Sequence, residues 1–137
     1  MNLQKLVLLL FLAVISVFET SLAQENKKYI EVLYFKANLA CCKARACNAL
    51  QADVDSVLIK YFANENIEFK AIRLADSANI DLVSKYNAKS QTVIIVTKIG
   101  QDESSVDVSA IVKDYARTSN KMKFEEEMKK SIAEAIK

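Results

Sequence analysis

The chain has 137 residues, with no histidine, proline or tryptophan, a single glycine and a net charge of +2. Without histidine it cannot supply a histidine general base, a catalytic triad or a histidine metal ligand. A single glycine excludes the glycine-rich loops that bind phosphates and dinucleotides, and the small net charge is not that of a nucleic-acid-binding protein. The chemistry that remains is that of thiols, carboxylates, lysines and tyrosines.

Residues 1–23 have the layout of a signal peptide. Lys5 precedes an apolar run over residues 6–18, and small residues at Ser21 and Ala23 suit a cleavage site. The run is shorter than the roughly 20 residues that a membrane-spanning helix needs. We therefore expect a periplasmic or secreted protein, with residues 24–137 forming one domain and no membrane span after cleavage.

The first half of this domain alternates strand and helix patterns. Residues 29–35 are β-branched and aromatic around Glu31, which predicts a mostly buried strand. From residue 46 to 61, apolar residues recur every three or four positions, which predicts an amphipathic helix. Residues 67–74 alternate again as a strand, with Ile67, Phe69, Ala71 and Leu74 facing inward. A short helix over residues 80–86 follows, capped by Ser77 or Asn79.

The second half begins with residues 92–97, a continuous β-branched run that is typical of a central strand. A turn at residues 99–102 leads to a weaker, antiparallel edge strand over residues 103–108. Two helical segments follow on either side of residues 118–120. The order β-α-β-α-β-β-α predicts an α/β fold, with a mixed four-stranded sheet and helices on both faces.

The three cysteines, Cys41, Cys42 and Cys47, lie close together between the first strand and the first helix. In a regular helix, residues five or six positions apart exceed the roughly 7 Å Cα separation that a disulfide allows. Cys42 can therefore reach Cys47 only if residues 41–44 form a loop and the helix begins near residue 44 or 45. Cys47 is also in phase with the apolar stripe of the helix, and the alternative is that it is a small buried core residue.

Three basic residues flank the thiols, namely Lys36, Lys43 and Arg45. Positive charge close to a thiol lowers its pKa and favours the reactive thiolate. The alternative is that these side chains are ordinary solvated charges in a lysine-rich chain.

The order of elements, with cysteines before the first helix, resembles the thioredoxin fold. The segments Tyr34-Phe35, Cys47-Asn48-Ala49-Leu50, Tyr61-Phe62 and Asp114-Tyr115-Ala116-Arg117 are similar to those of exported bacterial thioredoxin-like proteins. Some members of that family are labelled nitrophenyl compound nitroreductase subunit and occur in arsenic-resistance operons. The resemblance implies a C-x-x-C pair at the start of the first helix. Cys47 matches the second, resolving position of that pair, and Ala44 stands at the first.

Two further positions differ from the family pattern. The loop that faces the cysteines in this family usually carries a cis-proline and shapes the groove that receives a substrate. Here the matching residues are Ser90-Gln91-Thr92, so the resemblance implies substrate contacts at Gln91 and Thr92 in an altered loop. The buried acid before the phenylalanine of the first strand is replaced by Tyr34.

Three functions are consistent with these features. The first is an exported thiol–disulfide protein without a cofactor, which exchanges a disulfide or electrons with a partner protein; Cys42 or Cys41 would attack and Cys47 would resolve. The second is capture of a soft ion such as Cu(I) or As(III) by the clustered thiolates. The third is a thioredoxin-like binding module whose cysteines do no redox chemistry. No flavin or nicotinamide site is visible in the sequence.

Overall fold

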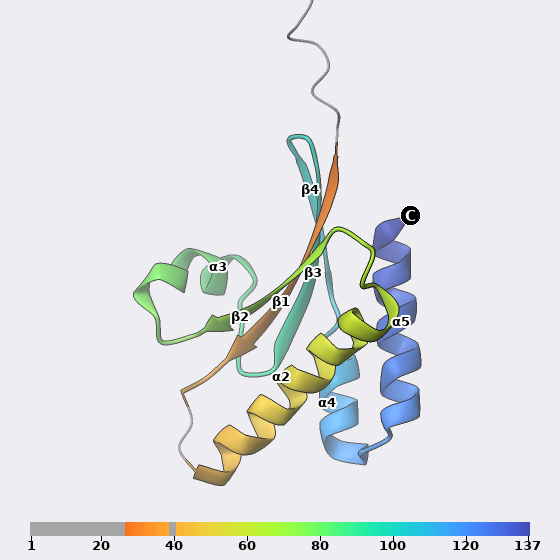
Figure 1. Ribbon diagram of the computed structural model, residues 1–137. Helices are drawn as coiled ribbons and strands as arrows, with labels where there is room; N and C mark the ends of the chain where they lie inside the picture. Colours follow the sequence, from red (N-terminus) through yellow and green to blue (C-terminus); the bar gives the residue numbers. More distant parts are fainter. Residues whose placement is uncertain (1–26, 39–40) are drawn as a thin grey trace, which may run out of the picture.

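The computed structural model describes residues 27–38 and 41–137, with the backbone alone for residues 41–44. The predicted signal peptide and its cleavage site lie outside the described residues. The elements follow in the order β1 (Lys28–Lys36), α2 (Cys41–Tyr61), β2 (Ile67–Arg73), the 3-10 turn η1 (Ser77–Asn79), α3 (Ile80–Lys85), β3 (Thr92–Ile99), β4 (Asp102–Asp107), α4 (Ser109–Thr118) and α5 (Lys121–Ile136) (Figure 1).

The four strands form one mixed sheet in the order β2-β1-β3-β4. The strand β1 is parallel to β2, because α2 carries the chain back across the sheet between them. It is antiparallel to β3, and β3 is antiparallel to β4, to which the short turn at Gly100 joins it. The central position of β3 and the edge position of β4 confirm the sequence predictions.

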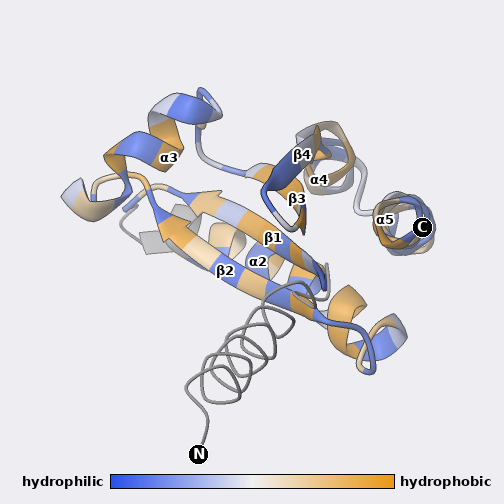
Figure 2. Ribbon diagram, turned by 90° about the horizontal axis from the view of Figure 1, so that it is seen from above, coloured by the Kyte–Doolittle hydropathy of each residue, from blue (hydrophilic) through white to orange (hydrophobic). Residues whose placement is uncertain are grey.

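Each face of the sheet packs against its own helices (Figures 1 and 2). Ile30, Val32 and Tyr34 of β1 face α2, α4 and α5, where they contribute to the larger core. The alternate residues Leu33 and Phe35 face α3 and contribute to a smaller core. The period of two in β1 therefore separates two apolar layers, and the prediction of helices on both faces is confirmed.

The strand order, the strand directions and the helices on both faces together define a thioredoxin-like α/β fold. At the end of the sheet where β1 finishes and β3 begins, α2 also begins. The candidate functional residues gather at this end of the fold.

Two local predictions were wrong, and one was right only in part. Ala71 is exposed, although it follows Ile67 and Phe69 on the face that packs against the larger core. Near the end of this edge strand only Ile72, which faces the α3 side, is buried. Asn79 is the N-cap residue of α3, one of the two predicted, but it makes no side-chain cap bond. The side-chain cap belongs to the preceding turn η1, where the Asp76 carboxylate accepts a hydrogen bond from the Ala78 N–H at 3.0 Å. The third concerns the start of α2 and is described with the candidate site.

The sheet face that packs against α3 is charged beyond the area that α3 covers. Glu31 of β1 is only 7% exposed and forms ion pairs with Lys70 of β2 and, at 2.6 Å, with Lys98 of β3. Burial alone would raise the pKa of Glu31, but the hydrogen bonds from the two lysines outweigh it, so the pKa of this carboxyl lies below its ordinary value. This part of the sheet is thus stabilised by paired charges and not by apolar packing.

Candidate thiol site at the start of the first helix

The helix α2 begins at Cys41, directly after the chain leaves β1. The prediction that residues 41–44 form a loop is therefore wrong. The apolar stripe that indicated a helix starts only at Cys47, but the residues before it, Lys43-Ala44-Arg45-Ala46, are all strong helix formers and extend the helix to the cysteine pair. Cys41 and Cys42 thus occupy the first turn of a helix of 21 residues.

This start affects the reactivity of the two cysteines. The first turn of α2 contains no acidic residue, and no Asp or Glu occurs between Glu31 and Asp53. The helix N-terminus carries a partial positive charge that stabilises a thiolate nearby. The backbone of the first turn of α2 thus combines a helix N-terminus with the absence of acidic residues.

The same start separates both cysteines from Cys47. Five residues of regular helix advance about 7.5 Å along the axis, so the Cα atoms of Cys42 and Cys47 lie beyond the reach of a disulfide. The described helix does not provide the loop that a bond to Cys47 required. The role of Cys47 as the resolving cysteine stays a prediction from the sequence.

Cys47 itself is a free thiol inside the larger core, with 3% of its surface exposed. The hydroxyl of Tyr34 donates a hydrogen bond to the Cys47 carbonyl at 3.1 Å and lies 3.5 Å from its sulfur. The hydroxyl of Ser90 lies 4.0 Å from the same sulfur. The expectation that Cys47 is buried in phase with Leu50 and Val54 is confirmed.

Tyr34 stands where the resemblance implied a buried acid, and its side chain is completely buried. Burial, followed by its hydrogen bond to Cys47, raises the pKa of Tyr34 well above the ordinary value, so the phenol stays neutral. The sequence did not indicate that Tyr34 contacts Cys47. The available signal was that Tyr34 and Cys47 both point into the same core, one from β1 and one from α2.

The loop before β3 is altered, as predicted. No cis peptide bond occurs among the described residues, and Gln91 adopts a left-handed conformation with φ 67°. Its N–H donates to the Phe35 carbonyl at 2.9 Å, which fixes the loop against the end of β1. Thr92 is buried, and its hydroxyl accepts a hydrogen bond from the Lys89 N–H at 3.0 Å.

A groove of about 390 Å³ runs beside the first half of α2. One wall is formed by Ala46, Ala49 and Asp53 of α2, the opposite wall by Tyr115 and Ala116 at the end of α4, and Gln91 contributes from the loop before β3. The carboxylate of Asp53 accepts hydrogen bonds from the Tyr115 hydroxyl at 3.1 Å and from Lys121 at 3.4 Å, so its charge is compensated.

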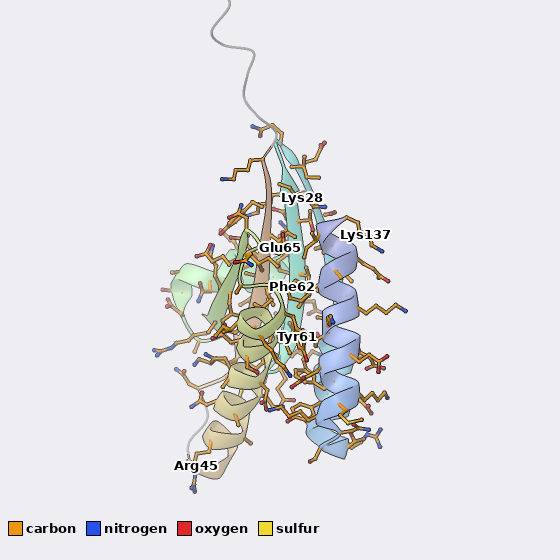
Figure 3. All side chains as sticks on the ribbon, turned by 45° about the vertical axis from the view of Figure 1, so that its right-hand side comes forward. Lys28, Arg45, Tyr61, Phe62, Glu65 and Lys137 are labelled. Atoms are coloured by element: carbon orange, nitrogen blue, oxygen red, sulfur yellow. The ribbon has the colours of Figure 1, made fainter. Side chains whose placement is uncertain are left out.

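Two of the predicted basic neighbours have described side chains. Arg45 is exposed at the tip of α2 and points away from the body of the protein (Figure 3). Lys36 at the end of β1 donates a hydrogen bond to Gln51 of α2 at 2.9 Å. Both add positive charge to the end of the molecule where α2 begins.

Among the residues with described side chains, no group of three potential ligands is placed to hold a metal ion. The side chains of Cys41 and Cys42 do not belong to that set, so the soft-ion hypothesis is not tested. Within the described ranges, no helix is long and apolar enough to cross a bilayer.

No protein-family model matches this chain, and no curated protein matches it. Two solved structures are distantly similar. One is a malarial protein, with 21% identity, a TM-score of 0.38, and coverage of 66% of this chain and 96% of that chain. The other is thioredoxin-2, a component of the malaria parasite protein secretion machinery, with 21% identity, a TM-score of 0.39, and coverage of 64% and 84%. The fold assignment rests on the strand order and directions of the chain itself.

Proposed function

We propose that this protein is an exported thiol–disulfide exchange protein whose reacting group is a cysteine of the Cys41-Cys42 pair. The observation that supports this proposal best is the position of the pair, in the first turn of the 21-residue helix α2 with no acidic residue beside it. Export rests on the sequence of residues 1–23 alone, which predicts a compartment where disulfides form and persist.

The exchange needs only one thiolate on this chain. The thiolate attacks one sulfur of a partner disulfide, the partner's sulfur–sulfur bond breaks, and the other partner sulfur leaves as a thiolate. The product is a mixed disulfide between the two proteins. A second thiol, from the partner or from a small free thiol, then attacks the mixed disulfide and restores the cysteine.

In this proposal Cys47 is a structural thiol. It is 3% exposed, its sulfur lies 3.5 Å from the Tyr34 hydroxyl and 4.0 Å from the Ser90 hydroxyl, and regular helix separates it from the pair. Reaction of a buried thiol with a protein disulfide would require the core around it to open, because exchange demands access to the sulfur.

The test is a disulfide-exchange assay with a protein substrate whose disulfide is reduced in the presence of dithiothreitol. We expect the double variant Cys41→Ser/Cys42→Ser to lose the catalysed rate, and Cys47→Ser to retain most of it, since serine can keep the contacts with Tyr34 and Ser90. Equal rates in the double variant and the wild type would refute the proposal. Loss of the rate in Cys47→Ser, with its fold intact by circular dichroism, would restore Cys47 as the resolving cysteine.

A further inference from the structure

We propose that the edge strand β2 pairs with β2 of a second copy of this chain. The two strands run antiparallel with Phe69 on the two-fold axis, so that the two four-stranded sheets join into one continuous sheet. This inference concerns a surface away from the cysteine pair and does not depend on the proposed function.

The backbone of β2 has an open side. β2 is one of the two edge strands, and among the described residues no strand pairs with its outer side. Directly before and after β2, the Asn66 carbonyl and the Leu74 N–H both bond to β1, at 3.2 and 2.9 Å. Since successive strand residues direct their N–H and C=O groups to alternate sides, those of Phe69 and Ala71 point outward. They are free to bond to another strand.

The charges of the segment around β2 are complementary to themselves when the segment is reversed. With Phe69 opposite Phe69 of the second copy, Glu68 faces Lys70 and Glu65 faces Arg73. The two-fold axis repeats each pair, so every charged residue of the segment faces one of opposite sign. Opposite charges across a strand pair are stabilising.

The two neighbouring registers lack this property. If the axis moves from Phe69 to the residue before it, Glu68 faces Glu68 of the second copy, and if it moves to the residue after it, Lys70 faces Lys70. Like charges directly opposite each other are destabilising. Charges on an edge strand generally oppose association. In β2 they oppose the neighbouring registers and favour a single one.

The inner and outer charge pairs contribute differently. Within one chain, Lys70 already forms ion pairs with Glu31 and, at 3.1 Å, with Glu68, so the inner pairs mainly keep like charges apart. Glu65 and Arg73 are both exposed, and neither forms an ion pair with another described residue. The outer pairs would therefore be new interactions between the two copies.

Apolar surface lies along the same edge. A groove of about 160 Å³ runs between the end of α2 and β2, and its lining includes Ile59, Phe62, Ile67 and Phe69. Ile59 is 67% exposed. Because Phe69 lies on the proposed axis, the grooves of the two copies would meet around it, and their apolar surface would be removed from water.

This arrangement leaves the candidate thiol site open. The strands β1 and β2 are parallel, so β2 ends at the same end of the sheet where α2 begins. Antiparallel pairing of the two β2 strands points these ends in opposite directions. The two cysteine pairs would therefore lie at opposite ends of the dimer, and neither copy would block the site of the other.

The experiment is sedimentation velocity of the exported protein over a range of concentrations, with dithiothreitol present to remove any disulfide between chains. We expect a reversible equilibrium between monomer and dimer. Arg73→Glu and Glu65→Arg each turn both outer pairs into like-charge pairs, and each should raise the Kd of the dimer at least about tenfold. Lys113→Glu, at an exposed position of α4, makes the same change in net charge as Arg73→Glu and should alter the Kd by less than about twofold.

A mixture of the two β2 variants tests the register. In a dimer of one Arg73→Glu chain and one Glu65→Arg chain, opposite charges face each other again at both outer pairs. The equimolar mixture should therefore associate with a Kd within about threefold of the wild-type value. Hydrogen exchange tests the backbone contact, because the amides of Phe69 and Ala71 should exchange more slowly in concentrated wild type than in concentrated Arg73→Glu.

Several results would overturn the inference. These are a monomer at every concentration up to about 1 mM, a dimer that dithiothreitol abolishes, or equal Kd values for Arg73→Glu and Lys113→Glu. Failure of the mixed variants to associate, or equal exchange of the Phe69 and Ala71 amides in wild type and Arg73→Glu, would do the same. Both substituted positions are exposed, and an unchanged circular dichroism spectrum excludes a folding defect. The disulfide-exchange assay tests the proposed function separately.

Discussion

The contact between Tyr34 and Cys47 gives the sharpest test of how the thiol end of the core is held together. Replacing Tyr34 by phenylalanine removes only the hydroxyl, which donates to the Cys47 carbonyl at 3.1 Å. That carbonyl keeps its bond within α2, so no buried acceptor is left without a partner and only the net value of one hydrogen bond, about 0.5–1.5 kcal/mol, is lost. The oxygen leaves a void of roughly 10 Å³, which adds about 0.2 kcal/mol.

We therefore expect Tyr34→Phe to lower the free energy of unfolding by about 1 kcal/mol, without changing its dependence on urea concentration. Urea unfolding followed by circular dichroism measures both quantities. The matched control is Tyr29→Phe in the same strand. There the lost hydroxyl donates to Glu68 at the exposed surface, where water competes for the bond, so the expected loss is below about 0.5 kcal/mol. Equal losses in the two variants would refute the assignment of a buried, net stabilising hydrogen bond to Tyr34.

Three further predictions follow from other contacts. The pKa of Glu31 is lowered by Lys70 and Lys98, so the stability that its carboxylate contributes should be present above the ordinary glutamate pKa and lost as the pH falls through the lower, folded value. Glu31→Gln should therefore reduce the dependence of the free energy of unfolding on pH in this acidic range, measured by urea unfolding at a series of pH values. An unchanged pH dependence would contradict the prediction. Met128→Ala should lower the free energy of unfolding by about 2–4 kcal/mol, because Met128 is completely buried. Met122→Ala, at an 84% exposed position of the same helix, should change it by no more than about 0.5 kcal/mol. Similar thermal midpoints for the two variants would be inconsistent with the described packing of α5. Ser119 closes α4 at φ 54°, so Ser119→Gly should raise the free energy of unfolding by about 0.5 kcal/mol, and a lower value would show that the serine is not strained there.

The sheet was predictable from the sequence because strand patterns are local. The unbroken β-branched run in β3 needs burial on both faces, and the polar composition of β4 suits an edge, so both strands could be placed without coordinates. Since α2 must connect β1 to β2 and α3 must connect β2 to β3, only a few strand orders were then possible. The break between α4 and α5 was also visible, since Ser119 and Asn120 interrupt the helical period.

The candidate site was harder to predict, because its features depend on contacts between distant segments. The spacing of apolar residues begins only at Cys47 and gave no information on the residues before it. Their high helix propensity was the signal for an earlier start, so the beginning of α2 was predicted too late. The groove is created by the end of α4 lying beside α2, and no local pattern in either helix indicates that proximity. The contact of Tyr34 with Cys47 likewise required the two core layers to be assembled first.

The ends of the described chain lie far from the candidate site. Lys28, at the start of β1, donates a hydrogen bond to the Ile136 carbonyl at 2.9 Å, so the first strand and the last helix are joined at one pole, and Arg45 marks the opposite pole (Figure 3). An affinity tag or surface tether attached after Lys137 would therefore leave the opposite end of the molecule, where α2 begins, free. Immobilised protein could then be used to trap a partner through its mixed disulfide, without the support blocking the approach.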